Sequence, residues 1–438
     1  MSRVLLLGAG LVAPPLVDYL VERGIWLTIA CNNPERGEAL LRGRPVGAVL
    51  DWAASDAEGL DRMVAHSDLV VSLLPASMHV EVAEACIHRR KHLVTTSYVS
   101  PEMRALDARA QKAGVVLLNE LGVDPGIDHM SAMEVIHRAQ RDGARVTSFR
   151  SYCGGIPAPE ANDNPFGYKF SWSPVGVLRA ATRPARFLEG GKLVERAAHE
   201  LVREVHPLEL PGVGTLEAYP NRDATDYLSL YGLDGIATMY RGTLRYPGWT
   251  ETMQALRLLG LLENDPPVAR HWDQLLAARL GLPDPSGLVS QLAAFLSLPP
   301  AAPVIERLRW LGLLSPRALP RHAPTVVEAL AGLMQEELAY RPGERDLLVM
   351  QHRFELERGP RRERVVSSLV CFGESGGDSA MARTVGLPAA IGARLLLEGR
   401  FTTPGVHIPV LQGLYEPILA ELATLGIALT ETHEELVA

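Results

Sequence analysis

The chain has 438 residues, of which 47 % are hydrophobic and 21 % charged, a globular composition in a chain too long for one ordinary core. Its net charge is −8 and it has no basic run, so nucleic acids and anionic membranes are poor candidates as partners. Four scattered cysteines favour a reduced, cytoplasmic setting. The N-terminus lacks a signal-peptide pattern, and we expect no apolar run of membrane-spanning length.

The first 125 residues alternate between short apolar runs and amphipathic segments. We expect strands at residues 4–7, 26–31, 48–50, 68–74, 92–95 and 115–119. We expect helices near residues 12–23, 58–65, 79–90 and 102–113. This alternation predicts a parallel, doubly wound sheet.

The first expected strand leads directly into the sequence GAGLVA at 8–13, which has the form G-x-G-x-x-A. The first glycine permits a tight turn, the second lets the backbone approach a pyrophosphate, and the alanine keeps the following helix close to the sheet. The helix N-terminus offers N–H groups to phosphate. The pattern therefore predicts a dinucleotide site whose contacts in this turn are Gly8, Gly10, Leu11 and Val12.

The choice of dinucleotide depends on the end of the second strand, where an acid would bind a ribose 2′-hydroxyl. This chain has Asn32 and Asn33 there, so a 2′-phosphate would not be repelled, and Arg36 is close enough in sequence to pair with it. We therefore expect NADP(H) in preference to NAD(H), although Arg36 could also be a solvated helix residue. Asp51, at the end of the third strand, is either an adenine-side contact or a helix N-cap.

Three further strand ends carry candidate ligand contacts, because ligands of open α/β sheets bind at the carboxyl ends of the strands. Leu73, Leu74 and Pro75 follow the fourth strand and should line the cofactor groove. Polar clusters at 95–98 and 119–129 follow the fifth and sixth strands and should open on the same crevice. Asp124, held extended by the following proline, is predicted to be functional, whereas Asp128 is predicted to be a helix N-cap.

The pattern changes after residue 146. Strands are expected at 146–152, 208–210, 239–246, 347–357 and 364–372, and their irregular spacing predicts an α+β substrate domain. Leu- and Ala-rich stretches at 253–338 predict a small all-helical insertion. Two helices near the C-terminus, at about 379–400 and from about 415, are expected to pack on the first domain.

The expected fold is thus α/β, a Rossmann domain with an inserted α+β substrate and dimerisation domain and a small all-helical domain. The predicted domain bounds are 1–128 with about 380–438, then 129–252 with about 339–379, and 253–338.

Residues 151–174 contain four prolines and three glycines without an apolar period, which predicts a loop. Its dense aromatic and charged side chains argue against disorder, so we expect an ordered, functional loop. Cys153, within this loop, is interpreted as a substrate contact rather than a nucleophile, since no basic neighbour is visible. Arg222 and Arg245 lie in turn-rich, aromatic surroundings. Because a guanidinium binds both oxygens of a carboxylate, the pair predicts a substrate with two or more carboxylates.

Seven segments, in order along the chain, resemble saccharopine dehydrogenase of the glutamate-forming type (saccharopine reductase). They are GAGLVA, SLLPASMH, TTSYVSPEM, NELGVDPGIDHM, SYCGGIPAPEANDNPFGYKFSWSPVGVL, YPNRD and RGTLRYPGW. The resemblance implies a homodimer that interconverts saccharopine, which carries three carboxylates, with glutamate and 2-aminoadipate 6-semialdehyde in lysine metabolism. It implies substrate contacts at Ser97, Tyr98, Asp124, Cys153, Gly154, Arg222, Thr243, Leu244 and Arg245. Near the nicotinamide it implies Val123, Asp124, Pro125 and Ser173.

Tyr98 and Asp124 are the candidate catalytic groups near the reacting amine. Two alternatives stay open: a related imine-reducing dehydrogenase of polyamine synthesis, of the carboxynorspermidine dehydrogenase type, and a nucleotide-binding sensor or scaffold without turnover. In the resemblance, the loop at 151–174 faces the strand ends that carry Tyr98 and Asp124. The sequence contains none of the common metal-site or serine-nucleophile motifs, so we expect no metal.

Overall fold

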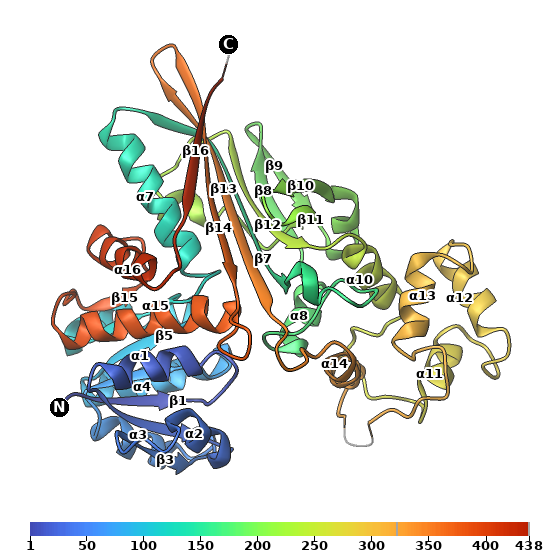
Figure 1. Ribbon diagram of the computed structural model, residues 1–438, viewed down its shortest axis with the longest axis horizontal. Helices are drawn as coiled ribbons and strands as arrows, with labels where there is room; N and C mark the ends of the chain where they lie inside the picture. The colour runs from blue at the N-terminus through green and yellow to red at the C-terminus, as the bar shows by residue number, and fades with distance from the viewer. Residues whose placement is uncertain (321–322, 437–438) are drawn as a thin grey trace. The chain divides into compact units, whose positions relative to one another are not determined.

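The computed structural model describes residues 1–320 and 323–436 (Figure 1). It divides into two compact units. Unit 1 consists of Met1–Val146 and Phe354–Ala438, and unit 2 consists of Thr147–Arg353. The C-terminal segment therefore belongs to the same unit as the N-terminal sheet, and unit 1 continues past residue 128, where the sequence analysis ended the Rossmann part.

Unit 1 is built on a seven-stranded sheet with the order β15-β6-β5-β4-β1-β2-β3. All its pairings are parallel, as predicted. The central strands are mostly apolar because helices cover both faces of such a sheet. The strands are β1 Arg3–Leu7, β2 Trp26–Cys31, β3 Gly47–Asp51, β4 Leu69–Ser72, β5 His92–Thr95, β6 Val116–Leu118 and β15 Gly405–His407.

The helices of unit 1 agree with the predicted ones except in two places. The segment expected as one helix at 102–113 is divided into α5 and α6, and α2 was not predicted. Asn33 caps α2, because its side chain accepts a hydrogen bond from the backbone N–H of Arg36. The helices are α1 Pro14–Glu22, α2 Pro34–Leu41, α3 Ala57–Ala65, α4 His79–Arg89, α5 Pro101–Arg104, α6 Asp107–Ala113, α7 Ile127–Arg141, α15 Ala380–Leu397 and α16 Gln412–Thr424.

The long helix α15 packs against α1 (Figure 1). A Cβ atom on Gly386 would lie 2.7 Å from the carbonyl oxygen of Val12, so only glycine permits this approach. Within the described residues, α15 is the one helix that passes a test of length and apolar composition for membrane spans, contrary to the expectation that no run would do so. However, 78 % of its apolar window is buried inside the protein, which is typical of a core helix.

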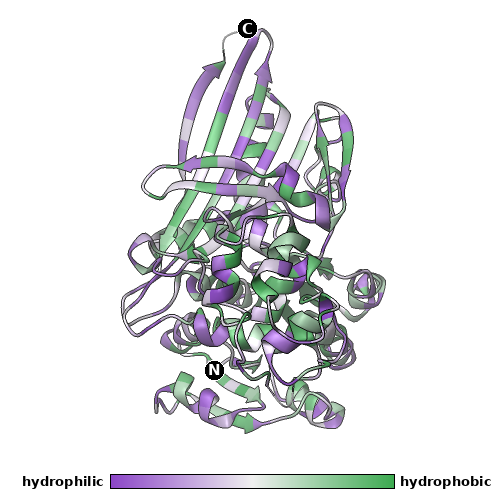
Figure 2. Cartoon of the chain, turned by 90° about the vertical axis from the view of Figure 1, so that its right-hand side faces the viewer, coloured by the Kyte–Doolittle hydropathy of each residue, from purple (hydrophilic) through white to green (hydrophobic). Residues whose placement is uncertain are grey.

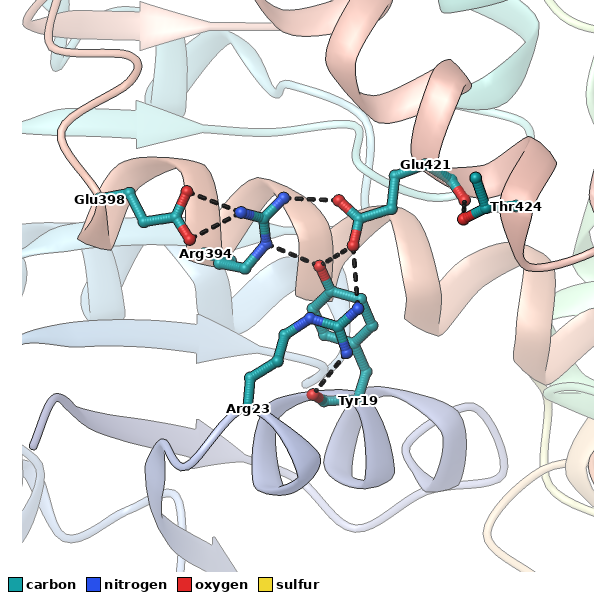
Figure 3. A network of polar contacts seen from close by, with 6 residues as sticks. All are labelled: Tyr19, Arg23, Arg394, Glu398, Glu421 and Thr424. Carbon is teal, nitrogen blue, oxygen red and sulfur yellow. Dashed lines mark hydrogen bonds and ion pairs between the residues drawn. The ribbon is translucent and has the colours of Figure 1, made fainter.

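A polar network fastens α1 to α15 and α16 (Figure 3). The Tyr19 hydroxyl donates to Glu421 at 2.6 Å and accepts from Nε of Arg394 at 2.8 Å. Arg23 donates to the same carboxylate at 3.0 Å. Burial, together with the hydrogen bond to Glu421, raises the pKa of Tyr19 to about 12, so the phenol keeps its proton and remains a donor. The network explains how the C-terminal segment is anchored to the first helix.

The second sheet is mixed, as predicted, with the order β10-β11-β12-β7-β13-β14-β16 and with β8 pairing with β12 and β9. Hydrophilic and hydrophobic residues both occur along its long strands (Figure 2), and the burial of β14 alternates over much of its length. Its strands are β7 Arg145–Pro157, β8 Ala185–Glu189, β9 Lys192–Arg196, β10 His206–Leu210, β11 Gly214–Pro220, β12 Thr238–Arg245, β13 Asp346–Arg358, β14 Arg361–Phe372 and β16 Thr430–Leu436.

One correction concerns residues 153–157, which were predicted to be loop after a strand at 146–152. They continue strand β7, whose residues 148–153 pair in parallel with residues 238–243 of β12. A Cβ atom on Gly154 would lie 2.4 Å from the carbonyl oxygen of Leu244. The glycine therefore serves a close approach of two backbones rather than a turn, which its sequence alone does not reveal.

The remaining helices lie in unit 2, and the described residues between 253 and 338 contain helices joined by turns, without a named strand, as predicted. Their core also contains Phe166, Tyr168 and Phe170, so this part shares one core with the turn-rich segment that precedes α8. The helices are α8 Pro174–Ala180, α9 Tyr227–Leu230, α10 Trp249–Leu258, α11 Trp272–Arg279, α12 Leu288–Leu296, α13 Pro303–Trp310 and α14 Val326–Glu337, and the short 3₁₀ turns are η1 Ala76–Met78, η2 Pro159–Ala161 and η3 Ala198–Glu204.

Candidate functional site

The glycine-rich turn has the geometry that a dinucleotide requires. Gly8 adopts φ 99°, which favours glycine, and its N–H donates to the carbonyl of Ala30 on β2 at 2.9 Å. A Cβ atom on Gly8 would be 3.4 Å from the backbone of Leu73, which follows β4. The turn is therefore held against the ends of both neighbouring strands, where the sequence analysis placed the cofactor contacts.

The N–H groups that are available to a phosphate lie in the turn and not in the first residues of the helix. Helix α1 begins with Pro14 and Pro15, which have no N–H, although the sequence analysis expected the helix to supply donors. Within residues 1–320 and 323–436, the N–H groups of Gly10, Leu11 and Val12 have no hydrogen-bond partner. These three donors at the mouth of a Gly-rich turn fit a pyrophosphate.

The cofactor contacts predicted after β2 and β3 lie in different local environments. Asn32 and Arg36 are exposed, and Asn33 is occupied as the cap of α2. The alternative of Asp51 as an N-cap is wrong, because Asp56 caps α3 through a hydrogen bond from Gly59 at 2.8 Å. Asp51 instead ends β3 with an exposed side chain, which leaves its cofactor contact as a prediction.

The two predicted catalytic groups meet. The Tyr98 hydroxyl donates to Oδ1 of Asp124 at 2.6 Å. The loops that carry them are also joined through the backbone, because Leu121 donates to the carbonyl of Thr95 at 3.0 Å and Glu120 donates to that of Ser97 at 3.3 Å. The strand ends at 95–98 and 119–129 are thus assembled as one polar surface, as the parallel sheet predicted.

A buried carboxylate that the sequence analysis did not single out supports this pair. Glu120 has a left-handed backbone, φ 62°, and is 5 % exposed. Its Oε1 accepts from the N–H of Val99 at 2.9 Å, and its Oε2 lies 2.6 Å from Nε2 of the fully buried His129. The carboxylate therefore positions the residue next to Tyr98. The sequence signal that could have predicted this role of Glu120 is the presence of an acid and a histidine in the same polar segment after a strand.

Asp128 is not the N-cap of α7, contrary to the prediction. The helix begins one residue earlier, at Ile127, because Gly126 makes the sharp turn with φ 145° and Ile127 donates to the carbonyl of Gly122. Asp128 is 2 % exposed, and its Oδ1 accepts from the N–H of Gly126 at 2.5 Å. The carboxylate thus stabilises the turn that follows Asp124.

In unit 2, all the predicted substrate contacts except Arg222 lie on the two adjacent strands β7 and β12. Cys153 of β7 is paired in register with Thr243 of β12, and Gly154 lies against the backbone of Leu244. Cys153 is 8 % exposed. Arg222 follows β11 with a left-handed backbone, φ 59°, and is half-buried.

Arg245 occupies a different environment from Arg222. It is 7 % exposed, its Nη1 donates to the carbonyl of Leu244 at 2.7 Å, and its guanidinium lies 5.1 Å from the ring centroid of Tyr168 and 5.8 Å from that of Trp249. Within the described residues, its Nε has no hydrogen-bond partner. Its aromatic contacts hold β12 against the segment of Tyr168, and its carboxylate contact stays a prediction.

Ser173, predicted near the nicotinamide, caps α8 by accepting from the N–H of Gly176 at 3.3 Å, and it is exposed. No group of three or more His, Cys, Asp or Glu side chains in the described part of the chain could hold a metal ion.

Two protein-family models match nearly the whole chain. The model of the saccharopine dehydrogenase NADP-binding domain matches residues 4–118. The model of the saccharopine dehydrogenase C-terminal domain matches residues 122–427. The first match covers the sheet with the glycine-rich turn, and the second begins beside Asp124.

Curated relatives agree with these models. The mitochondrial alpha-aminoadipic semialdehyde synthase of Bos taurus is 39 % identical over 98 % of this chain, which spans about half of that relative, 47 %. The NADP(+), L-glutamate-forming saccharopine dehydrogenase of Pyricularia oryzae is 37 % identical over 96 % of each chain. The enzyme of the same name from Saccharomyces cerevisiae is 36 % identical over 98 % of this chain and 99 % of its own length.

A solved structure confirms the fold class predicted from the sequence. The apo saccharopine dehydrogenase (L-Glu forming) from Saccharomyces cerevisiae has a TM-score of 0.89 to this chain at 35 % sequence identity. The match covers 99 % of this chain and all of the other, 100 %. The predicted resemblance therefore holds in sequence, in domain models and in fold.

Proposed function

The chain belongs to the saccharopine dehydrogenase family, and we propose that it interconverts saccharopine with L-glutamate and 2-aminoadipate 6-semialdehyde. In the oxidative direction, saccharopine, NADP⁺ and water would give glutamate, the semialdehyde, NADPH and a proton. The observation that carries the proposal is the 2.6 Å hydrogen bond from Tyr98 to Asp124 at the strand ends, in a chain that matches the NADP-binding domain of this family.

The cofactor supported by the family match is NADP(H). The three partnerless N–H groups of Gly10, Leu11 and Val12 would hold the pyrophosphate, and Asn32 with Arg36 would hold the 2′-phosphate. When bound, the nicotinamide accepts or returns the hydride.

The chain's own groups handle the proton and the charges. Oxidation removes a proton from the secondary amine of saccharopine and a hydride from the carbon beside it, and water then hydrolyses the imine to the aldehyde and the amine of glutamate. Asp124 would take the amine proton, directly or through water, while the Tyr98 hydroxyl fixes the orientation of its carboxylate. The substrate's carboxylates and its carbon chain would be bound by the predicted substrate contacts. These are Ser97, Cys153, Gly154, Arg222, Thr243, Leu244 and Arg245.

An absorbance assay of the reduced nicotinamide tests the proposal. Saccharopine with NADP⁺ should produce NADPH, and the semialdehyde with glutamate should consume it. Turnover of carboxynorspermidine precursors without turnover of saccharopine would indicate instead an imine-reducing dehydrogenase of polyamine synthesis. Tight cofactor binding without turnover of any imine would favour a sensor or scaffold. We also propose that the protein is a cytoplasmic homodimer. Its molar mass, measured by light scattering, would test the oligomeric state.

A further inference from the structure

Three polar side chains form a row at the carboxyl ends of two neighbouring strands. Ser72 ends β4, His79 begins α4, and Ser97 follows β5. Nδ1 of His79 lies 3.0 Å from Oγ of Ser72, and its Nε2 lies 2.9 Å from Oγ of Ser97. The imidazole therefore bridges the turn predicted to line the cofactor groove and a predicted substrate contact.

The bridge is uncharged at neutral pH. The His79 side chain is 4 % exposed, and burial lowers its pKa to about 4. A neutral imidazole has one N–H donor and one acceptor nitrogen. One of the two hydroxyls must therefore donate to the ring, while the other accepts from it.

The burial of Ser72 decides which hydroxyl donates. Its side chain is fully buried, and across residues 1–320 and 323–436 its Oγ has no hydrogen-bond partner other than His79. If Ser72 accepted from Nδ1, its own hydroxyl proton would be buried without an acceptor, which proteins avoid. Ser72 therefore donates to Nδ1, and the ring carries its proton on Nε2.

The direction of this first hydrogen bond fixes the direction of the second one, between His79 and Ser97. Nε2–H of His79 donates to Oγ of Ser97, which leaves the hydroxyl proton of Ser97 for a further partner. Ser97 is half-buried and directly precedes Tyr98, whose hydroxyl binds Asp124. Because Ser97 is half-buried, this proton is available to an acceptor that reaches it from the accessible side, close in sequence to the Tyr98–Asp124 pair.

We propose that His79 is a positioning residue that makes Ser97 a one-directional hydrogen-bond donor to a carboxylate oxygen of the substrate. The inference rests on the proposed function, because it assigns the role of one substrate contact in the same site. A carboxylate accepts hydrogen bonds and cannot donate them, so a Ser97 hydroxyl that donated to His79 would have no proton to offer it. The imidazole itself exchanges no proton with the substrate.

Two matched substitutions separate the two ring nitrogens. In His79→Asn the amide can replace Nδ1 and keep the contact with Ser72, whereas in His79→Gln it can replace Nε2 and keep the contact with Ser97. We expect His79→Asn to raise the KM for saccharopine roughly tenfold with a smaller change in kcat, as loss of one hydrogen bond to a charged group would do. In His79→Gln the KM for saccharopine should stay close to the wild-type value, because the contact with Ser97 is kept.

Ser97→Ala should raise KM as much as His79→Asn, and the double variant should be no worse than either, because the two residues act as one unit. His92→Asn is the matched control, since His92 is a half-buried histidine of the same sheet that accepts from the N–H of Val116 and lies outside the row. It should lower Tm without raising KM. Equal KM increases in His79→Asn and His79→Gln, or additive losses in the double variant, would overturn the proposal.

Nitrogen NMR of the isotope-labelled wild-type protein tests the polarity without substrate. The histidine signal that disappears in His79→Asn should be that of a neutral ring protonated on Nε2. A ring protonated on Nδ1 would overturn the proposal. Lack of saccharopine turnover by the wild type would count against the proposed function alone, since the tautomer is measured independently of activity.

Discussion

Two polar segments of this chain look alike in sequence and differ in what their polar atoms do. Residues 119–129 and 158–173 are both rich in Gly, Pro, acids and amides. In the first, Asp124 accepts a hydrogen bond from Tyr98 of the neighbouring strand end. In the second, Lys169 is 3 % exposed and binds Asp163 at 2.8 Å and Glu344 at 2.6 Å. Turn-rich composition therefore does not distinguish the segment that carries a candidate catalytic residue from a segment that is held by ion pairs within the protein.

The difference lies in the partners. Lys169 is enclosed by two acids and lies 5.9 Å from the ring centroid of Tyr340, and Phe170 donates to the carbonyl of Leu338. These contacts tie the segment to the end of α14, whose core it shares. The charged residues of this segment correctly predicted that it is ordered. In the structure, Lys169 of this segment forms ion pairs within the protein. Substitutions in the two segments should accordingly affect catalysis in one and stability in the other.

The largest effect is expected for Asp124→Asn. An asparagine can still accept from the Tyr98 hydroxyl but cannot take a proton, so kcat with saccharopine should fall by about 10²-fold or more at little cost in Tm. Asp61→Asn is the control, because Asp61 is a surface acid on α3 that pairs with Arg89. A kcat within roughly threefold of wild type would remove Asp124 from proton transfer.

Arg222→Ala should raise the KM for saccharopine by about 10- to 100-fold, because a charge-assisted contact with a substrate carboxylate is lost. Arg186→Ala is the neighbouring control, since the exposed side chain of Arg186 pairs with Glu195 and Asp223. Arg245→Leu should instead lower Tm, because the buried guanidinium contacts Tyr168 and Trp249. An unchanged KM in Arg222→Ala would refute the assignment of that carboxylate contact.

Lys169→Met should lower the free energy of unfolding by about 2 kcal/mol, less than for a fully buried pair because Asp163 and Glu344 retain some access to water. Since Lys169 binds the scaffold, kcat and KM should stay near the wild-type values. Denaturant unfolding and the saccharopine assay together check this prediction. A loss of activity without a loss of stability would mean that the 158–173 segment takes part in catalysis, as is predicted for Tyr98 and Asp124.

Gly154→Ala should destabilise the protein by about 1–3 kcal/mol, because the new methyl group would lie 2.4 Å from the carbonyl oxygen of Leu244. Gly155→Ala offers a neighbouring comparison in the same strand. Thermal unfolding of both variants measures the difference. If Gly154→Ala were as stable as wild type, residues 151–157 would not form the tight strand pair.

The smallest effect concerns pH. The folded pKa of His79 is about 4, below the value near 6.5 of an unfolded histidine, so the unfolded chain binds more protons as pH falls between these values. The stabilisation present above pH ~6.5 is therefore lost progressively down to pH ~4. His79→Asn should reduce the loss of stability between pH 7 and 5 by on the order of 1 kcal/mol. Identical pH slopes in urea unfolding would contradict this.

Much of unit 1 could be predicted because its signals are local. The apolar runs of β1 and β4, the glycine-rich turn at 8–13 and the amphipathic helices each occupy a few consecutive residues, and the parallel arrangement follows from their alternation. The same rule placed Tyr98 and Asp124 at neighbouring strand ends. Their direct hydrogen bond required only that the two loops come together there.

Contacts between distant residues could not be predicted in this way. β7 continues to Pro157 because β12 lies beside it, and the three-residue strand β15 exists because β6 offers it an edge. Glu120 meets His129, and His79 meets Ser97, only after the turns between them are folded. The sequence by itself determined the α/β class, the dinucleotide turn and the candidate catalytic pair. Only the tertiary structure decided which polar groups meet, because a hydrogen bond depends on the position of its partner in space and not on its spacing along the chain.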